Sequence, residues 1–127
     1  MKLTNEQIKA KYPETAERLI GERRVLRRLL NAIRGSGYTF RINNGEDFEC
    51  DFTQDVVTGM DACMATDEDH VVVYRARPDD GTFERIGKFW LVYGNSPSEV
   101  IADYSAKQSF ESLFSRWFDE ATEGEDM

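Results

Sequence analysis

Five arginines gather in the first third of the chain, where their guanidinium groups offer binding sites for anions. They lie in a segment that predicts a helix from Glu14 to Arg34, and they are Arg23, Arg24, Arg27, Arg28 and Arg34. A planar guanidinium donates paired N–H groups to carboxylates and to phosphates. Three interpretations stay open at this point: a solvated flank balanced by nearby acids, a surface for an acidic protein partner or a second copy of the chain, and a site for nucleic-acid phosphates.

A second candidate surface is acidic. Its residues are Glu46, Asp47, Glu49, Asp51, Asp67, Glu68 and Asp69. The first four decorate a predicted strand, on which Glu49 and Asp51 should point away from the apolar residues. The last three belong to a predicted solvated loop. These acids form either an ordinary polar outer face or an acidic recognition surface that resembles the phosphates of a nucleic acid.

The two kinds of charge are distributed unequally along the sequence. The net charge is −8, and residues 1–45 carry +6 whereas residues 46–127 carry −14. Such a distribution steers charged partners and favours head-to-tail pairing of two copies. The overall negative charge repels a polyanion unless the basic face is well separated, so we rank nucleic acid below protein as a partner.

Signals for catalysis and for metal binding are weak. The only histidine, His70, follows three acidic residues, but the spaced oxygen ligands of a calcium loop and the usual zinc patterns are missing from the sequence. Cys50 and Cys63 each fall in an apolar pattern, where a buried thiol is usually inert. No phosphate-binding loop or nucleophile elbow is present. We therefore expect no catalytic residue, no metal site and no cofactor.

Composition places the chain among soluble globular proteins. It has 127 residues, of which 40% are hydrophobic and 31% charged, which suits one domain with a modest core. No run of about 18 apolar residues predicts a membrane span, and the first residues lack the apolar region of a signal peptide. We expect a cytoplasmic protein.

Helix signals mark both ends of the chain. Thr4 to Gln7 matches a capping box that opens a short helix. The long arginine-rich helix should end at Gly35-Ser36-Gly37, a glycine stop signal. Ser105 to Gln108 is a second capping box, and the helix Ala106 to Ala121 after it has the clearest amphipathic pattern in the chain, with four aromatic residues on one stripe. Residues 122–127 read as an acidic, frayed tail.

Strand signals fill the middle of the chain. Tyr38 to Ile42 and Phe48 to Phe52 alternate apolar and polar residues, and a three-residue loop with left-handed Gly45 would place Phe40 opposite Phe48. Val71 to Arg77 and Thr82 to Tyr93 predict a second hairpin with a bulge near Gly87.

Two segments are harder to assign. Thr53 to Thr66 has helical spacing, with Thr53 as its cap. Asn95 to Tyr104 is either a helix start or a turn followed by a strand from Glu99 to Tyr104. We favour the strand, because Val-Ile pairs favour strands.

Residues Trp90 to Tyr104, WLVYGNSPSEVIADY, resemble a segment of small uncharacterised proteins of phages and prophages. Their shared pattern is an aromatic-aliphatic strand, a Tyr-Gly-Asn turn and a Val-Ile-x-Asp-Tyr strand. The resemblance implies an origin in a mobile element and transfers no catalytic residue.

Together these patterns predict one α+β domain over residues 1–121. An antiparallel sheet of four or five strands should pack against the long N-terminal helix and the amphipathic C-terminal helix. The function expected is that of a non-enzymatic protein-binding module, an accessory or inhibitor of a host factor that acts through charged surfaces. A nucleic-acid-binding regulator that uses the arginine-rich helix is the alternative, and a homodimer is one form the protein could take.

Overall fold

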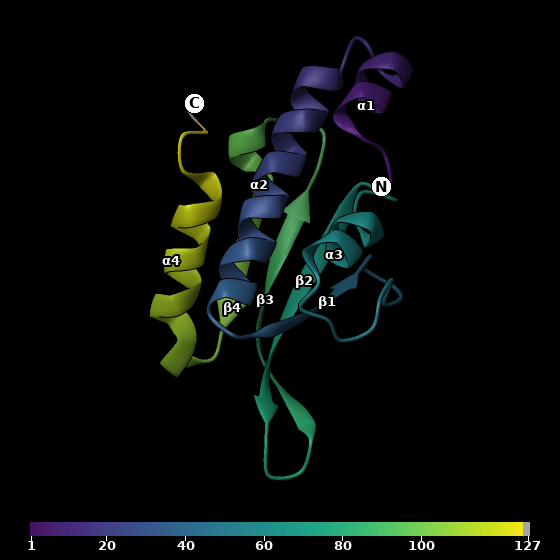
Figure 1. The fold of residues 1–127 in the computed structure, drawn as a ribbon. Coiled ribbons are helices and arrows are strands. Elements are labelled where there is room, and N and C mark those ends of the chain that lie inside the picture. Colours follow the sequence, from purple (N-terminus) through teal and green to yellow (C-terminus); the bar gives the residue numbers. More distant parts are fainter. Residues whose placement is uncertain (126–127) are drawn as a thin grey trace.

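The computed structural model describes residues 1–125, with helices packed on one face of an antiparallel sheet (Figure 1). The helices are α1 (Asn5–Lys11), α2 (Ala16–Gly35), α3 (Val56–Ala62) and α4 (Glu111–Thr122). The strands are β1 (Thr39–Asn43), β2 (Glu68–Arg77), β3 (Thr82–Val92) and β4 (Ile101–Ala106), and short 3-10 turns lie at Pro97–Glu99 and Gln108–Phe110. The predicted α+β class is confirmed, as are the long N-terminal and the C-terminal helix.

The N-terminal helices begin and end at the expected local signals. The Thr4 hydroxyl accepts from the Gln7 N–H, and the Gln7 side chain accepts from the Thr4 N–H, so the predicted capping box is confirmed. α2 begins two residues later than expected, after a turn that contains Pro13. It ends before Gly37, whose φ of +88° is the left-handed conformation that glycine favours at a helix stop.

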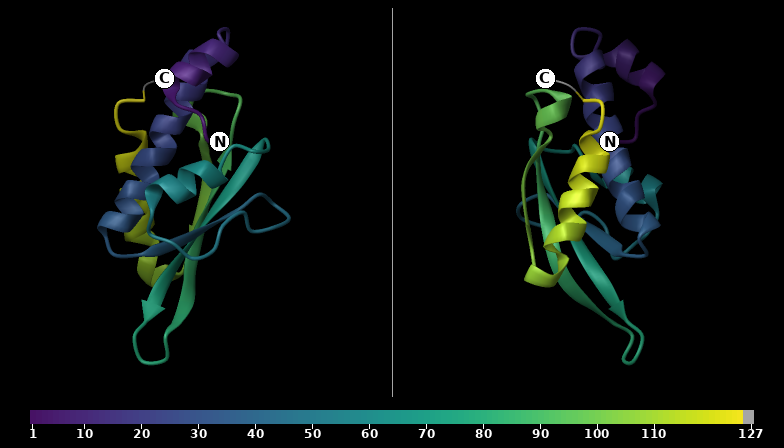
Figure 2. Two further views of the ribbon diagram at one scale, coloured as in Figure 1. Left: turned by 45° about the vertical axis from the view of Figure 1, so that its right-hand side comes forward. Right: turned by 90° about the vertical axis from the view of Figure 1, so that its left-hand side faces the viewer.

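The sheet has the order β1-β2-β3-β4, and each neighbouring pair is antiparallel. The pairing of β2 with β3 shifts between Val73, which faces Gly87, and Tyr74, which faces Arg85. The predicted bulge near Gly87 is thereby confirmed. Beyond the bulge, the β2–β3 hairpin continues past the helices and projects from the domain (Figure 2).

The predicted hairpin between residues 38–42 and 48–52 is wrong. β1 pairs along its whole length with β2, and the segment after it makes only isolated bridges, Asn43 with Phe48 and Phe40 with Thr53. The reason lies in the turn, where the side chains of Asn43 and Asn44 accept hydrogen bonds from the N–H groups of residues 45 to 47. These bonds stabilise a wide loop, and Gly45 has the expected left-handed φ of +103° within it.

The segment from residue 53 to 66 contains one short helix, α3, as its spacing indicates. Its cap is Asp55, whose carboxylate accepts from the Val57 N–H, and not Thr53. Thr53 instead pairs with Phe40 through two backbone hydrogen bonds. Gly59 of α3 lies against Phe40 and Leu30, and a side chain there would overlap both.

Both interpretations of residues 95–104 are partly right. Pro97–Glu99 forms a 3-10 turn, and β4 follows it as the edge strand beside β3. The second capping box is wrong, because β4 continues through Ser105 and Ala106, which pair with Lys88 and Gly87. α4 therefore begins only at Glu111, after a further 3-10 turn.

The core lies between the sheet and the helices α2 and α4. Buried residues of α4 are Phe114, Trp117 and Ala121, so the aromatic stripe of the last helix packs inside the domain. The Phe114 ring stacks on Phe89 of β3 at a centroid distance of 4.8 Å. From α2 the core receives Val25, Leu26, Leu29, Leu30 and Ile33.

An ion-pair cluster ties the base of the projecting hairpin to β4. The Glu84 carboxylate contacts Arg75, lies 2.7 Å from the Lys107 ammonium and lies 3.6 Å from the Arg77 guanidinium. Hydrogen bonds from Lys107 and Arg75 lower the pKa of Glu84 to about 2. A carboxylate with a lowered pKa stabilises the fold above its unfolded pKa, and this contribution is lost as the pH falls toward the folded value.

We therefore expect wild type to be more stable than Glu84→Gln at pH 6, with the difference shrinking between pH 4.5 and about pH 2. Urea unfolding of both proteins across this range measures the difference. Added salt should reduce it at pH 6, because exposed charges are screened. A difference that stays constant with pH would contradict this assignment.

Candidate binding surfaces

Most of the predicted arginine cluster is engaged within the chain. Arg24 and Arg28 both bind the Glu125 carboxylate. Arg23 is buried, and its Nη1 donates to the Met1 carbonyl oxygen at 2.9 Å. Arg27 and Arg34 are exposed on α2 and form no ion pair with any residue among 1–125. The guanidinium groups expected on one surface thus have three different environments.

Arg23 is the clearest correction to the predicted arginine surface. Its position beside Arg24 on the helix indicates solvent, but the N-terminal segment passes over it and removes it from the surface. Another arginine of α2, Arg18, also pairs internally, with its Nη1 2.6 Å from the Glu22 carboxylate. Glu22 is buried and accepts a second hydrogen bond from the Gly94 N–H at 2.8 Å. These contacts hold the turn after β3 against α2.

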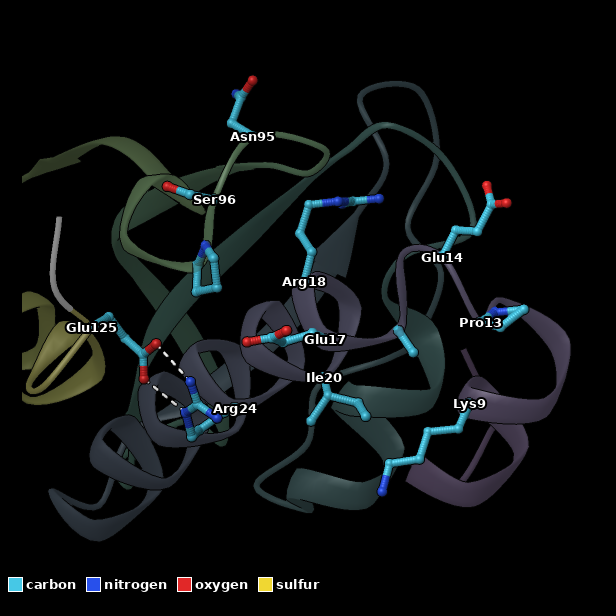
Figure 3. Close-up of a pocket in the computed structure, with 12 residues that line it drawn as sticks. Lys9, Pro13, Glu14, Glu17, Arg18, Ile20, Arg24, Asn95, Ser96 and Glu125 are labelled. Atoms are coloured by element: carbon cyan, nitrogen blue, oxygen red, sulfur yellow. Dashed lines mark hydrogen bonds and ion pairs between the residues drawn. The ribbon is translucent and has the colours of Figure 1, made fainter.

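A cleft of about 850 Å³ opens beside α2 and runs between the α1–α2 turn and residues 95–97 (Figure 3). Its charged residues are Lys9, Glu14, Glu17, Arg18, Arg24 and Glu125. Arg24 and Glu125 pair with each other at one end, with both guanidinium–carboxylate hydrogen bonds at 2.7 Å. The cleft therefore carries charges of both signs. Arg24 and Glu125 already neutralise each other within it.

Five of the seven predicted acidic residues lie on the surface. Glu46, Asp47, Glu49, Asp51 and Asp67 are exposed. Glu46, Asp67 and Glu68 come together around one shallow hollow at the end of the sheet, where the loop after β1 meets the start of β2. Glu68 is half-buried and accepts from the Trp90 indole N–H at 2.6 Å.

Asp69 does not belong to the acidic surface. It lies in β2, is fully buried, and accepts from the Tyr93 hydroxyl at 2.6 Å and from the Met64 N–H at 2.8 Å. The prediction of a solvated loop from residue 66 to 69 is wrong because β2 begins at Glu68. Burial raises the pKa of Asp69, and the two hydrogen bonds act in the opposite direction.

The two cysteines pack in or against the core, whereas the histidine lies on the other side of the sheet. Cys63 is buried in the core, where desolvation raises the pKa of its thiol well above the usual range. His70 alternates with core-facing Val71 and so faces the other side of the sheet. Cys50 is half-buried, and burial raises the pKa of its thiol as well. Thiols with raised pKa values are poor nucleophiles at neutral pH. Within residues 1–125, no three acidic, histidine or cysteine side chains are placed to share a metal ion.

The open face of the sheet is the surface that the sequence did not reveal. Strand residues alternate between faces, so those that point away from α2 and α4 form a face without a helix of residues 1–125 over it. Four aromatic residues on this side are between 36% and 42% exposed. We call them the aromatic face: Phe48, Phe52, Phe83 and Trp90.

Ring contacts connect three of these residues, Phe52 with Phe83 directly and Phe48 with Phe52 through Arg41, whereas Trp90 packs beside His70. Phe52 stacks on Phe83 at a centroid distance of 4.3 Å and meets Tyr74 edge-on at 4.7 Å. The Arg41 guanidinium lies 3.5 Å from the Phe48 ring centroid and 4.7 Å from that of Phe52. On the far side, the rings of Trp90 and His70 lie parallel beside a hollow of about 280 Å³.

Cations dominate the middle of the aromatic face. Arg41 of β1 and Lys88 of β3 both pair with Val72 of β2, and Arg85 of β3 pairs with Tyr74 of β2. The acids among the strand residues on this side, Glu68 and Asp103, line one hollow, and Glu68 accepts from the Trp90 indole N–H. Glu49 and Asp51 are exposed in the segment that carries Phe48 and Phe52. The sequence signal that pointed here was the alternation of Phe48 and Phe52, but it could not indicate which side of the sheet they would cover.

None of the helices within residues 1–125 combines the length and the apolar character needed to cross a membrane. Comparison with protein-family models, with curated proteins and with solved structures finds no match to this chain.

Proposed function

We propose that this protein is a non-enzymatic module that binds another protein, and that the partner docks on the aromatic face. The observation that carries the proposal is the set of four exposed aromatic side chains on a sheet face without a covering helix. Aromatic residues and arginine supply most of the binding energy in protein interfaces. Exposed apolar patches rimmed by polar residues mark interaction sites on soluble proteins.

Charge indicates what the partner presents. Arg41, Lys88 and Arg85 stand among the aromatic rings, so a complementary surface carries carboxylates beside apolar side chains. A second copy would bring the same cations against themselves in a two-fold interface of this face, because such an interface uses the same patch twice. The proposal therefore names an acidic partner protein and not a homodimer through this face.

A non-enzymatic role fits the environment of the titratable groups. The charged residues of the cleft beside α2 include a satisfied Arg24–Glu125 pair, and the buried thiol has a raised pKa. An origin in a phage or another mobile element, action in the cytoplasm and inhibition of a host factor extend the proposal. The mobile-element origin rests on the resemblance of residues 90–104, the inhibitory role on that resemblance and the unequal charge distribution, and the cytoplasmic location on the sequence composition.

Photo-crosslinking tests which face is used. Benzoylphenylalanine replaces Phe83 in one variant and Val57 in a matched control, since Val57 is an exposed apolar residue on α3, on the helix side of the sheet. In a bacterial lysate we expect a defined protein adduct at position 83 and none at position 57. Equal adducts at both positions, no adduct, or an adduct with a second copy of the chain would each contradict the proposal.

Once the adduct is identified, Trp90→Ala should weaken the purified complex by about 2 kcal/mol, about thirtyfold in Kd, if Trp90 anchors the interface. Isothermal titration of wild type, Trp90→Ala and Val57→Ala measures the change. Val57→Ala should bind as wild type does. If Trp90→Ala weakens the affinity by less than about threefold, Trp90 is not part of the interface.

The nucleic-acid alternative retains support from Arg27 and Arg34 alone, the two arginines of the predicted set that are exposed and form no ion pair among residues 1–125. With two separated cations the affinity for nucleic acid depends only weakly on salt, whereas phosphate binding by five arginines would make this dependence steep. Gel shifts at two salt concentrations distinguish these cases, and a steep dependence would restore the alternative.

A further inference from the structure

Arg24 and Arg28, one turn apart on α2, hold the segment Glu123–Glu125, which we call the tail segment. Arg24 donates from Nε and Nη2 to the two oxygens of Glu125, both at 2.7 Å. Arg28 Nη1 donates to the Glu123 backbone carbonyl at 2.5 Å and to the Glu125 carboxylate at 3.2 Å. Such bidentate charge-assisted bonds are among the strongest single contacts that an exposed arginine makes.

The contacts of Arg24 and Arg28 are suited to a peptide, because one of them is made to a backbone carbonyl. One arginine binds a main-chain carbonyl, and both bind a carboxylate two residues further along. Gly124 between them adopts a φ of +77°, and the Glu125 N–H closes the turn onto the Thr122 carbonyl. A bare phosphate group has no counterpart to the main-chain carbonyl, so the geometry favours an acidic peptide over a nucleic acid.

The carboxylate is enclosed while its two arginines stay accessible. The Glu125 side chain is 7% exposed, whereas those of Arg24 and Arg28 are 45% and 40% exposed. Figure 3 shows Glu125 at the end of the cleft, between the segment of Ser96 and the Arg24 side chain. Arg24 and Glu125 both line the cleft of about 850 Å³, so removing Glu125 would leave the Arg24 guanidinium without its partner there.

Little else holds the tail segment in place. Its hydrogen bonds within residues 1–125 are those to the two arginines and the one to Thr122. The buried residues of α4 all precede it, so it can leave without opening the core. A segment bound through a few polar contacts opens locally at a low free-energy cost, so an external competitor exchanges with it readily.

We infer that the Arg24–Arg28 pair is a recognition site for an acidic peptide segment of a partner protein, and that the tail segment occupies it as an internal competitor. This inference rests on the proposed function, because it takes the partner to be a protein. It adds a second contact point for the partner, away from the aromatic face. The tail segment regulates access to this second contact point.

The test uses the tail sequence itself as an external probe. The peptide Thr-Glu-Gly-Glu-Asp-Met is titrated into the full-length protein at low salt, and the Arg24 Nε–H resonance is followed by NMR. Binding to a site that is free only part of the time raises the apparent Kd in proportion. We expect Glu125→Gln, which weakens the internal competitor, to bind the peptide at least about fivefold more tightly than wild type does.

Further variants separate the site from the competitor. Gly124→Val should produce the same tightening without touching a charge, because a β-branched residue disfavours a φ of +77°. Adding Arg28→Ala to Glu125→Gln should abolish peptide binding. Glu120→Gln, which removes a surface ion pair with Arg116 on α4, is the matched control and should leave the apparent Kd unchanged.

Three results would overturn the inference: no peptide binding by any variant, the same Kd for wild type and both tail variants, or tighter binding of a single-stranded oligonucleotide of equal charge. A peptide with glutamine and asparagine in place of its acids should not bind. Phe83→Ala should leave the titration unchanged, so failure of this site and failure of the aromatic face are recorded separately.

Discussion

Gly87→Ala should destabilise the protein by about 3 kcal/mol, because the added methyl group has no space between β3, β4 and α4. A Cβ atom at this position would lie 2.7 Å from Cζ of Phe114 and 2.9 Å from Cα of Ala106, and closer still to the Ser105 carbonyl oxygen. Two of these atoms belong to the backbone of β4, so a change of rotamer cannot relieve the overlap. Urea unfolding of the purified variant measures the loss.

The same substitution elsewhere in the chain provides the control. Gly35 at the end of α2 has open space around its Cα, and its φ is within the range of ordinary residues. Gly35→Ala should therefore be neutral or stabilising by up to about 1 kcal/mol. Combining Gly87→Ala with Phe114→Leu should recover only part of the loss, since the contacts with β4 persist. If Gly87→Ala proved as stable as wild type, β4 would have to move away from β3 to make room for the methyl group.

Features of the fold that depend on neighbouring residues were predictable. The capping box at Thr4, the glycine stop after α2 and the bulge at Gly87 each arise from bonds or clashes within a few residues. The stripe of α4 was equally clear, because a helix with four aromatic residues on one side has to bury that side. Its starting residue was not, because β4 competed for Ser105 and Ala106.

Pairing between distant segments was not predictable from alternation alone. The pattern of residues 48–52 shows which side chains share a face, but it does not identify the partner strand or the layer to which that face belongs. In the structure β2 takes the place beside β1, and Phe48 and Phe52 cover the side of the sheet away from α2. The packing of Gly21 in α2 was equally hidden from the sequence, because Pro97 lies so close that a Cβ at Gly21 would be 2.5 Å from the proline ring.

The candidate site shows why charge along the sequence differs from charge in space. Glu125 lies about a hundred residues from Arg24, and no local pattern connects them. Their pairing removes two of the predicted arginines from the free basic surface, and burial removes Arg23. The separation of basic and acidic segments along the chain therefore does not persist as two opposed faces, which leaves the aromatic face and the Arg24–Arg28 pair as the surfaces proposed for recognition.

Asp69→Ala is the second substitution for which we expect a large loss, about 2–5 kcal/mol. It leaves the Tyr93 hydroxyl and the Met64 N–H without their acceptor, and each unpaired buried donor costs about 1–3 kcal/mol. Met64 also holds a φ of +67°, which is rare for a residue with a side chain, so its bond to Asp69 helps to keep a strained backbone in place. Urea unfolding at pH 7 measures the loss. A loss below about 0.5 kcal/mol, the usual scale of a neutral surface change, would contradict the prediction.

Asp69→Asn separates the role of the hydrogen bonds from that of the charge. The amide oxygen can accept both bonds, so this variant should lose far less stability than Asp69→Ala. Burial raises the pKa of Asp69 in the folded state, so its contribution is fully present below the unfolded pKa of about 3.9 and is lost as the pH rises through the folded value. Because asparagine does not titrate, the stability of Asp69→Asn relative to wild type should increase between pH 4 and pH 7. A difference independent of pH would mean that the carboxyl group stays in the same protonation state on unfolding, and the buried charge would then have no part in the stability of this network.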